Sequence, residues 1–353
     1  MPDGSSTRYV RNAWYVAAWT PDLPADGPAA VSILGEPIVL WRSDGRLVAH
    51  EDRCVHRLAP LSLGRCEGAR LRCMYHGLLF DADGRCVEIP GQDLVPAQAR
   101  VRSYPVVDRH SWAWVWMGDP ALADPALIPP AIGLDHPDYI LGHGLLDYAA
   151  EARLINDNLL DFSHLTYVHA NSFGAGAVFA NDRPKLETLP RGVRFSRWVV
   201  GTAGPVGRSG DQLVDNFMTY DFLIPGVLLM WNGSFAVGTA EALNYETPDY
   251  GKAIGGVTFT SQAVTPTGDK SARYFFSWGP HREHGDEALR DVLMGIGGQA
   301  FAEDKVMIEA QQRVIDRTPD PVIMPTAHDR GVTIFNRLVE KLAREEQPAA
   351  VAA

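Results

Sequence analysis

Two pairs of cysteine and histidine lie close together in the first quarter of the chain. Cys54 and His56 form a Cys-x-His pair, and Cys73 and His76 form a Cys-x-x-His pair. Thiolate sulfur and imidazole nitrogen are the ligands that proteins use for zinc and for some iron–sulfur clusters. The spacing places each pair on one short loop, so that each of two loops would offer one ligand of either kind.

The mixed composition of each pair favours an iron–sulfur cluster over zinc. A structural Cys₂His₂ zinc site usually takes its two Cys from one segment and its two His from another. In a Rieske [2Fe–2S] cluster two Cys hold one iron and two His hold the other, so each loop must reach both irons. We therefore predict a Rieske [2Fe–2S] cluster on Cys54, His56, Cys73 and His76, with structural zinc as the alternative.

A second group of polar residues surrounds two further histidines. Asn158, Asp161 and His164 follow one another at three-residue steps in the segment 151–169, whose pattern is helical. Such steps would place them on adjoining parts of one helix face. His164 and His169 are five positions apart, which is about 140° on an ideal helix. They can share a metal only if the helix ends or distorts between them, and we predict such a break, of the π type found at functional sites.

A carboxylate is needed to complete a metal site with these histidines. Two His and one carboxylate form the facial triad of non-haem Fe(II) oxygenases. Glu303 and Asp304 lie in a late helical segment, and their spacing does not choose between them. Either could also be a solvated helix charge, and two His near a helix end are more often structural than ligands. Downstream of an electron-carrying cluster, however, an oxygen-activating iron is the favoured interpretation.

Short strands and tight turns surround the two cysteine–histidine loops. Asp44-Gly45 and Asp83-Gly84 each separate two apolar runs, which is a strong local signal for a β-hairpin. Trp112, Trp114 and Trp116 alternate with smaller residues, as in a strand with core aromatic side chains. We expect an all-β domain over residues 9–118.

The rest of the chain predicts an α+β domain after a linker. Residues 119–139 are Pro-rich and form the expected linker, residues 140–346 the second domain, and residues 347–353 a frayed tail. Three helical segments flank five strand-like runs, which favours an antiparallel sheet covered by helices. The helical segments are 151–169, 287–316 and 332–346, and the strand-like runs are 195–200, 217–224, 227–231, 256–260 and 273–278.

Composition limits the class of protein. The 353 residues suffice for two domains, and a formal charge of −11 argues against a nucleic-acid-binding protein. Cys66 and Cys86 are the only other cysteines, so a disulfide scaffold is not expected. Residues 1–8 are polar, and no apolar run has the length of a membrane helix. We expect a cytoplasmic protein.

These motifs resemble the α-subunits of Rieske non-haem iron oxygenases, in particular the vanillate and dicamba O-demethylase group. The resemblance covers nearly the whole chain and implies an all-β Rieske domain followed by an α+β helix-grip (START-like) catalytic domain with an antiparallel sheet. Val55 and Leu58 depart from the Pro and Gly that are frequent in the family, but neither is a ligand. The resemblance rests on both cysteine–histidine loops and on residues 11–18, 118–125, 157–164, 167–169 and 303–305.

The resemblance also implies a role for each site residue. His164, His169 and Asp304 would bind Fe(II), which selects Asp304 over Glu303, and Asn158 would lie near the iron. Asp161 would bridge electron transfer between a Rieske His of one subunit and an iron-binding His of its neighbour in a head-to-tail homotrimer.

The implied activity is that of a terminal oxygenase supplied by a separate NAD(P)H-dependent reductase with flavin and a ferredoxin-type cluster. We predict O₂-dependent O-demethylation of a methoxylated, vanillate-like aromatic acid to a phenol and formaldehyde. The alternatives are hydroxylation of a ring, alkyl or N-methyl group, and a non-enzymatic electron carrier. Gln262 and Gly295 align with family substrate contacts. Gly295 lies in a Gly-rich stretch of a helical pattern, which close helix packing would explain equally well.

Overall fold

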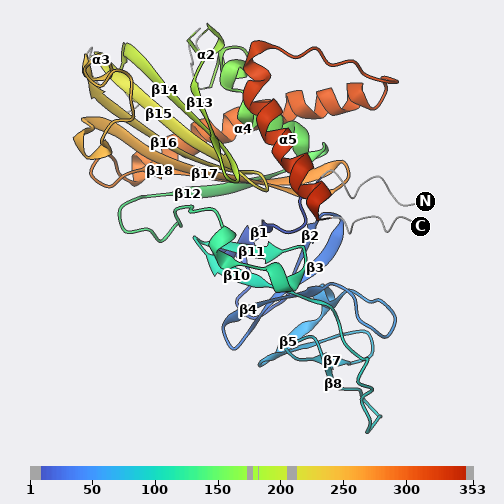
Figure 1. The fold of residues 1–353 in the computed structure, drawn as a ribbon. Helices are drawn as coiled ribbons and strands as arrows, with labels where there is room; N and C mark the ends of the chain where they lie inside the picture. The colour runs from blue at the N-terminus through green and yellow to red at the C-terminus, as the bar shows by residue number, and fades with distance from the viewer. Residues whose placement is uncertain (1–8, 173–177, 182, 205–212, 347–353) are drawn as a thin grey trace.

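A computed structural model describes residues 9–172, 178–181, 183–204 and 213–346. Small sheets built from the N-terminal third form one end of the molecule, and a large sheet with its helices forms the other (Figure 1). The predicted tail, 347–353, lies outside the described residues. Within the described part of the chain, no helix is long and apolar enough to span a membrane.

The N-terminal end consists of three small antiparallel sheets with the orders β2-β3-β4-β9, β5-β6-β7-β8 and β1-β11-β10. Both predicted hairpins are confirmed: Asp44-Gly45 joins β3 to β4 with positive φ at both residues, and Asp83-Gly84 joins β7 to β8. The strands are β1 (Trp14–Trp19), β2 (Ala29–Ile33), β3 (Glu36–Ser43), β4 (Arg46–Glu51), β5 (Arg65–Glu67), β6 (Arg70–Arg72), β7 (Leu79–Phe80), β8 (Cys86–Glu88), β9 (Ser103–Tyr104), β10 (Val106–Arg109) and β11 (Trp112–Trp116).

The tryptophan strand β11 lies where the two ends of the molecule meet. Its five residues are all buried, so the predicted alternation separates two packed faces rather than a core face and a solvent face. The tryptophans share a core cluster with Phe259 and Phe275 of the large sheet. A second cluster joins Val115 of β11 to residues of the long helix and the large sheet. The proposed domain division at residues 119–139 therefore stays a prediction, because continuous cores cross it.

The large sheet has seven antiparallel strands in the order β12-β18-β17-β16-β15-β14-β13. Each predicted run falls on one of these strands, but the strands are longer than the runs by up to eight residues at one end, and the structure adds the two edge strands. The strands are β12 (Gly142–Tyr148), β13 (Lys185–Leu189), β14 (Gly192–Ala203), β15 (Leu213–Leu223), β16 (Val227–Ala236), β17 (Gly255–Gly268) and β18 (Ser271–Pro280). The helices are α1 (Ala152–Leu160), α2 (Val178–Asn181), α3 (Thr239–Ala242), α4 (Glu287–Ile315) and α5 (Arg330–Glu345).

Helix α4 defines the functional face of this sheet. The ring of Phe276 on β18 packs against Phe301 of α4 with centroids 4.8 Å apart. A Cβ on Gly297 of α4 would lie 3.3 Å from Trp278, so the missing side chain lets the helix approach the strand. Gln262 pairs with Phe276 across β17 and β18, and opposite residues of neighbouring strands point to the same side. Gln262 therefore faces the helix layer.

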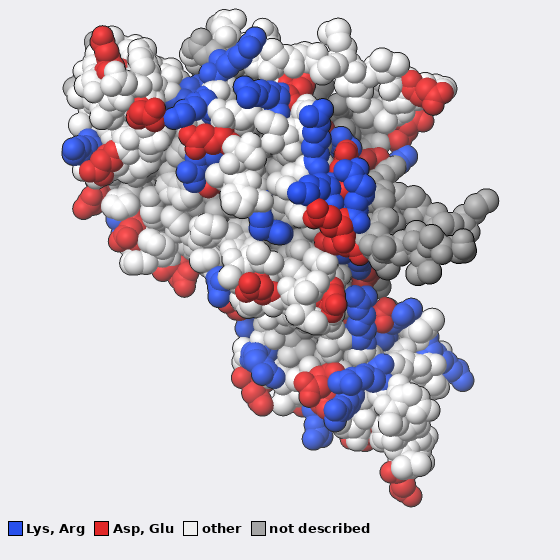
Figure 2. All heavy atoms as spheres, viewed as in Figure 1, with Lys and Arg blue, Asp and Glu red and all other residues white. Residues whose placement is uncertain are grey.

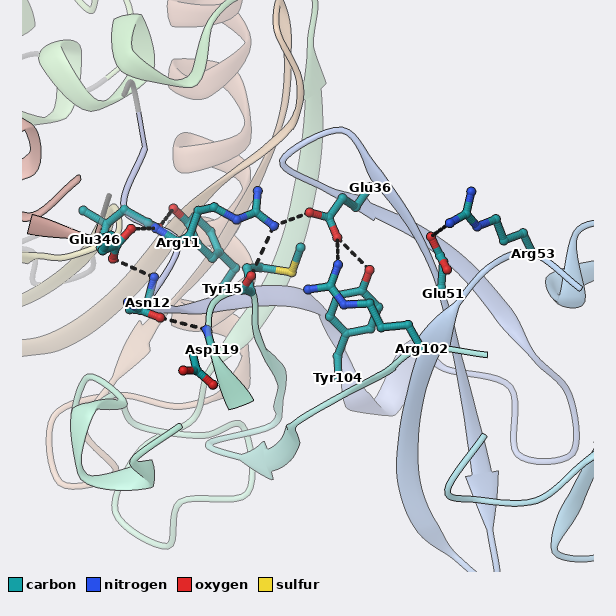
Figure 3. A network of polar contacts seen from close by, with 12 residues as sticks. Arg11, Asn12, Tyr15, Glu36, Glu51, Arg53, Arg102, Tyr104, Asp119 and Glu346 are labelled. Atoms are coloured by element: carbon teal, nitrogen blue, oxygen red, sulfur yellow. Dashed lines mark hydrogen bonds and ion pairs between the residues drawn. The ribbon is translucent and has the colours of Figure 1, made fainter. Parts of the chain in front are cut away.

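A polar network ties the end of α5 to the segment just before β1, and that segment to the small sheets (Figure 3). Glu346 accepts hydrogen bonds at 2.7 Å from the backbone N–H groups of Arg11 and Asn12. Glu36 accepts hydrogen bonds from the side chains of Arg11, Arg102 and Tyr104, the last at 2.7 Å. Burial opposes ionisation of Glu36, but these three partners outweigh it and hold the pKa of Glu36 below its usual value.

We predict that Glu36→Gln lowers the free energy of unfolding by about 2 kcal/mol at pH 7, because charged hydrogen bonds are lost. A carboxyl with a lowered pKa stabilises the fold above the pKa it has in the unfolded chain, and this stabilisation disappears as the pH falls through its folded pKa. The difference between the proteins should therefore shrink below about pH 4.5. Urea unfolding of the wild type and the variant, at pH 7 and again below about pH 4.5, measures this difference in the free energy of unfolding. Glu51→Gln, which removes only the ion pair with Arg53, should cost less than about 1 kcal/mol.

Candidate metal centres

The two cysteine–histidine loops have the same backbone geometry. In the first, Cys54 N–H donates to Ala59 and Leu58 N–H donates back to Cys54. In the second, Cys73 N–H donates to Leu78 and Gly77 N–H donates back to Cys73. These paired turns place both thiols in the interior and both imidazoles at the surface, with His56 and His76 ring centroids 4.4 Å apart. Burial, together with the neighbouring Cys73, raises the pKa of Cys54 to about 11, so a bound cation is needed to keep the thiolate at neutral pH.

The equivalence of the loops explains one departure from the family pattern. Leu58 and Gly77 occupy the same loop position, and both have a left-handed backbone with φ of +59° and +78°. Glycine adopts this conformation freely, whereas Leu58 pays roughly 1 kcal/mol for it. Its side chain, like those of Met74 and Tyr75, is more than half exposed beside the imidazoles. The loop tips thus present an apolar rim around His56 and His76, which are exposed as well.

The two downstream histidines converge on Asp304. Its Oδ1 atom lies 3.5 Å from His164 Nε2 and 3.1 Å from His169 Nε2. Asn158 donates a 3.2 Å hydrogen bond from Nδ2 to the same oxygen. The side chains of His169 and Asp304 are almost fully buried. Two imidazoles and one carboxylate thus meet at one point, as the facial triad of a non-haem iron requires.

The prediction of one helix over residues 151–169 is wrong. Helix α1 ends at Leu160, and Asp161 has the extended backbone angles φ −130° and ψ 97°. A 3₁₀ turn, η6 (Phe162–Thr166), follows, and its first N–H groups are capped by the Asp161 side chain, which accepts from Ser163 at 2.8 Å. The predicted shared helix face of Asn158, Asp161 and His164 therefore does not exist. The break that lets both histidines face one point comes from this 3₁₀ turn and its end at Thr166, rather than from a π turn.

Glu303 holds His169 from the opposite side. Its Oε2 atom lies 2.9 Å from His169 Nδ1 and accepts a 2.7 Å hydrogen bond from Ser172 Oγ, while Gln299 donates to Oε1 at 3.1 Å. Adjacent residues on a helix point about 100° apart, so Glu303 and Asp304 reach different nitrogens of one imidazole. Sequence reasoning treated them as alternatives and did not find the supporting position of Glu303 or of Ser172.

The electrostatics of this site suit a divalent cation. Burial lowers the pKa of His164, which favours the neutral imidazole that metals bind. Burial also opposes charging of His169, but Asp304 and Glu303 outweigh it and raise the pKa of that imidazole. Two carboxylates beside two imidazoles leave negative charge in a mostly buried place. A bound divalent ion would neutralise that charge and replace the proton on His169.

The two predicted substrate contacts lie in different surroundings. Gln262 is 5% exposed, and its Oε1 atom has no hydrogen-bond partner among the described residues. Gly295 lies on the exposed side of α4, where an added Cβ would meet nothing within 4 Å. Close packing therefore explains Gly297, which lies against Trp278, but not Gly295. A substrate role for Gly295 stays a prediction.

Comparisons with known proteins cover nearly the whole chain. Residues 13–105 match the Rieske [2Fe-2S] domain family, and residues 148–345 match the vanillate O-demethylase oxygenase C-terminal domain family. The iron–sulfur subunit of the toluene-4-sulfonate monooxygenase system of Comamonas testosteroni is 36% identical over 96% of this chain and 98% of its own length. The vanillate O-demethylase oxygenase subunit of Pseudomonas sp. (strain HR199 / DSM 7063) is 36% identical over 98% of both chains.

Solved structures give the same result. The crystal structure of dicamba monooxygenase bound to 3,6-dichlorosalicylic acid is similar with a TM-score of 0.86 and 31% identity, over 96% of this chain and 99% of that one. Another dicamba monooxygenase structure contains non-haem iron. The predicted family, fold class and cofactors are confirmed. The chain belongs to the Rieske non-haem iron oxygenases, as an oxygenase component that uses a Rieske [2Fe–2S] cluster and a mononuclear iron.

Proposed function

We propose that this oxygenase component removes the methyl group of a methoxylated aromatic acid. The aryl methyl ether, O₂, two electrons and two protons would give a phenol, formaldehyde and water. Hydroxylation of the methyl carbon forms a hemiacetal, whose carbon–oxygen bond then breaks with proton transfer to the phenol oxygen. Similarity to a vanillate O-demethylase subunit over both chains supports this choice.

We assign the ligands from the donor sets. Cys54, His56, Cys73 and His76 would hold the cluster, and His164, His169 and Asp304 would hold the iron. The mononuclear iron supplies oxygen activation when bound. The chain supplies the rest: Asn158 fixes the Asp304 carboxylate, and the helix layer covers the substrate and excludes water.

The observation that supports this class of substrate is the position of Gln262. Its Oε1 atom, which has no hydrogen-bond partner in the described part of the chain, is buried between Leu228 and Phe276 on the face that α4 covers. A buried acceptor without a partner is costly, so a ligand that donates a hydrogen bond there gains affinity. The phenolic hydroxyl of a vanillate-like acid is such a donor, and the flanking apolar side chains suit its ring.

We predict that Gln262→Leu raises the KM for vanillate about 10-fold, in line with the loss of one buried hydrogen bond. The KM for 3-methoxybenzoate, which lacks the phenolic hydroxyl, should change little. Steady-state kinetics on both substrates measure the difference. An equal rise in KM for the two substrates would contradict the hydroxyl contact. Unchanged iron and cluster content in the variant would show that both metal centres are intact.

We predict that Glu303→Ala weakens Fe(II) binding about 10- to 100-fold, because the orientation of His169 is no longer fixed. Glu303→Gln keeps a hydrogen-bond acceptor without the charge, so its Fe(II) affinity should lie between those of Glu303→Ala and the wild type. Competition with a chelator measures the affinity, and the visible spectrum of the cluster reports on the fold. An Fe(II) affinity unchanged in Glu303→Ala would show that Glu303 does not support the site.

Electron transfer requires a second copy of the chain in this proposal. The cluster loops and helix α4 lie at opposite ends of the molecule (Figure 1). The apolar rim around His56 and His76 would pack against a neighbouring subunit, and its imidazoles would approach the neighbour's Asp161 in a head-to-tail homotrimer. Sedimentation equilibrium tests the trimer, and a monomer with full activity would contradict it.

The electrons come from a separate reductase, because the relatives are components of multicomponent systems. We propose an NAD(P)H-dependent flavoprotein with a ferredoxin-type cluster. Residues 51–102 hold eight Arg against seven Asp or Glu, although the whole chain has a formal charge of −11. Basic and acidic side chains are interspersed at this end in Figure 2. The cluster end therefore does not repel an acidic electron donor.

A second reaction is favoured by one observation, the 36% identity with a toluene-4-sulfonate monooxygenase subunit. In it, the methyl group of an aromatic sulfonic acid would be hydroxylated and retained as an alcohol. Turnover of vanillate and of toluene-4-sulfonate with a reductase separates the two reactions. Formaldehyde equal to the phenol formed supports demethylation. A benzylic alcohol from the sulfonate, with no product from vanillate, would overturn it in favour of hydroxylation.

A further inference from the structure

A second group of metal-type donors lies outside both redox centres, in the connection between β18 and α4. The chain there reads His281-Arg282-Glu283-His284. One nitrogen from each histidine and one carboxylate oxygen of Glu283 all lie within 4.8 Å of one another. Among the described residues, only this trio and the iron donors His164, His169 and Asp304 meet that limit.

The ring geometry is close to that of the iron site. The centroids of His281 and His284 are 5.9 Å apart, against 5.2 Å for His164 and His169. His281 Nδ1 lies 4.0 Å from Glu283 Oε2. That nitrogen accepts a long, 3.3 Å hydrogen bond from the backbone N–H of Glu283, so its lone pair faces the start of the same residue whose carboxylate lies 4.0 Å away. A cation bound to both His281 Nδ1 and Glu283 Oε2 would draw these two atoms together and replace the weak hydrogen bond from the backbone.

The backbone of this turn is fixed from several sides. His284 N–H donates to His281 at 2.8 Å, and His281 N–H donates to Val257, near the start of β17, at 2.9 Å. The Tyr139 ring stands edge-on to His281 at 5.2 Å. Arg282 donates its backbone N–H to Asp138 and its side-chain Nε to Pro137, which directs the nearest cationic group along the linker. The donors are thus held on a rigid support rather than on a mobile loop.

We propose that His281, Glu283 and His284 form a binding site for a borderline divalent transition-metal ion such as Zn²⁺. Imidazole nitrogen and carboxylate oxygen are zinc ligands, and three protein ligands leave one tetrahedral position for water. Mg²⁺ and Ca²⁺ prefer oxygen ligands alone and should not bind here. Glu283 is 80% exposed and His281 25%, so the ion would be reached from solvent. Bound metal would tie the linker and β17 to the start of α4, the helix that carries Asp304.

The test is equilibrium dialysis of the full, untagged, iron-loaded protein against Zn²⁺, with metal content measured per chain. Iron loading fills the mononuclear site, so one zinc per chain beyond the iron is expected, with no displacement by Mg²⁺. His281→Ala and His284→Ala should each weaken this binding at least 10-fold. His136→Ala, which removes another imidazole that contacts Tyr139, should not change it.

Further variants keep the outcome independent of folding and of the proposed reaction. Glu283→Gln alters an exposed side chain and should weaken zinc binding several-fold while the cluster spectrum and thermal midpoint stay unchanged. Asp304→Ala should leave zinc binding at the turn intact even though it damages the iron site. Equal zinc binding by the wild type and the His281→Ala/His284→Ala double variant would overturn the proposal. So would the absence of bound zinc in the wild type.

Discussion

Replacing Asp304 by Ala should remove the mononuclear iron and abolish oxygenation, while the Rieske cluster remains. Among the residues that the structure describes, Asp304 supplies the one carboxylate oxygen placed between His164 and His169, and its side chain is 6% exposed. Two imidazoles alone lack the charge that balances a divalent ion in a buried place. Loss of an outer partner of a metal ligand costs about 10- to 100-fold, so loss of the ligand itself should reduce turnover by more than about 100-fold.

Iron analysis and the EPR spectrum of the reduced protein measure this result. The wild type should contain three irons and two acid-labile sulfides per chain, and Asp304→Ala should contain two of each. Asp291→Asn is the matched control, because Asp291 lies on the same helix, is exposed, and forms an ion pair with the neighbouring Arg290. A third iron retained in Asp304→Ala, or lost in Asp291→Asn, would contradict the ligand assignment.

The ligand loops could be predicted from sequence because their chemistry is local. Each loop holds its Cys and its His within four residues, and a backbone turn closes on the Cys itself. The structure needs no distant residue to bring Cys54 and His56 together. The conformation of Leu58 could not be predicted from composition, since a left-handed backbone at a non-glycine residue is tolerated only where the surrounding turn imposes it.

The large sheet was predicted in its centre and missed at its edges. The five predicted strands are the five inner strands, β14 to β18, where apolar runs are buried. β12 carries two glycines and β13 is the short sequence KLETL, largely exposed. Edge strands have one unpaired side and a weaker hydrophobic pattern. Their identity is therefore set by the neighbouring strands, which a local pattern does not contain.

At the iron site, too, a local sequence pattern was not enough to predict the structure of one segment. Residues 151–169 have helix-compatible spacing throughout, yet the helix stops at Leu160 because the Asp161 side chain caps the next turn. Asp two positions before Ser163 is a capping signal that could have located this break. The pairing of Glu303 with His169 could not be found in this way, because it depends on how α4 lies against the segment that follows η6.

Replacing Asp161 by Asn should leave both metal centres loaded but slow the transfer of electrons between them by about 10- to 100-fold. Asp161 is well suited to such a test because it has two separable roles. Its side-chain oxygen caps η6 through the N–H of Ser163, and its backbone carbonyl faces His164 Nδ1. Asn keeps the capping oxygen and the backbone, so the loop that positions His164 should persist. Only the carboxylate charge, which would bind the imidazole N–H of the neighbouring subunit's cluster ligand, is removed.

The measurement is the rate of cluster re-oxidation after the reduced protein is mixed with substrate and O₂ in a single turnover. Asp161→Asn should show three irons per chain, the same oligomeric state as the wild type and a slow re-oxidation. Asp161→Ala loses the cap as well, so it should also lose iron at the mononuclear site. Ser163→Ala is the control, because it retains the backbone N–H that Asp161 caps. Fast re-oxidation in Asp161→Asn would show that electrons reach the iron without this carboxylate, whereas loss of iron would show that its charge serves the His164 loop instead.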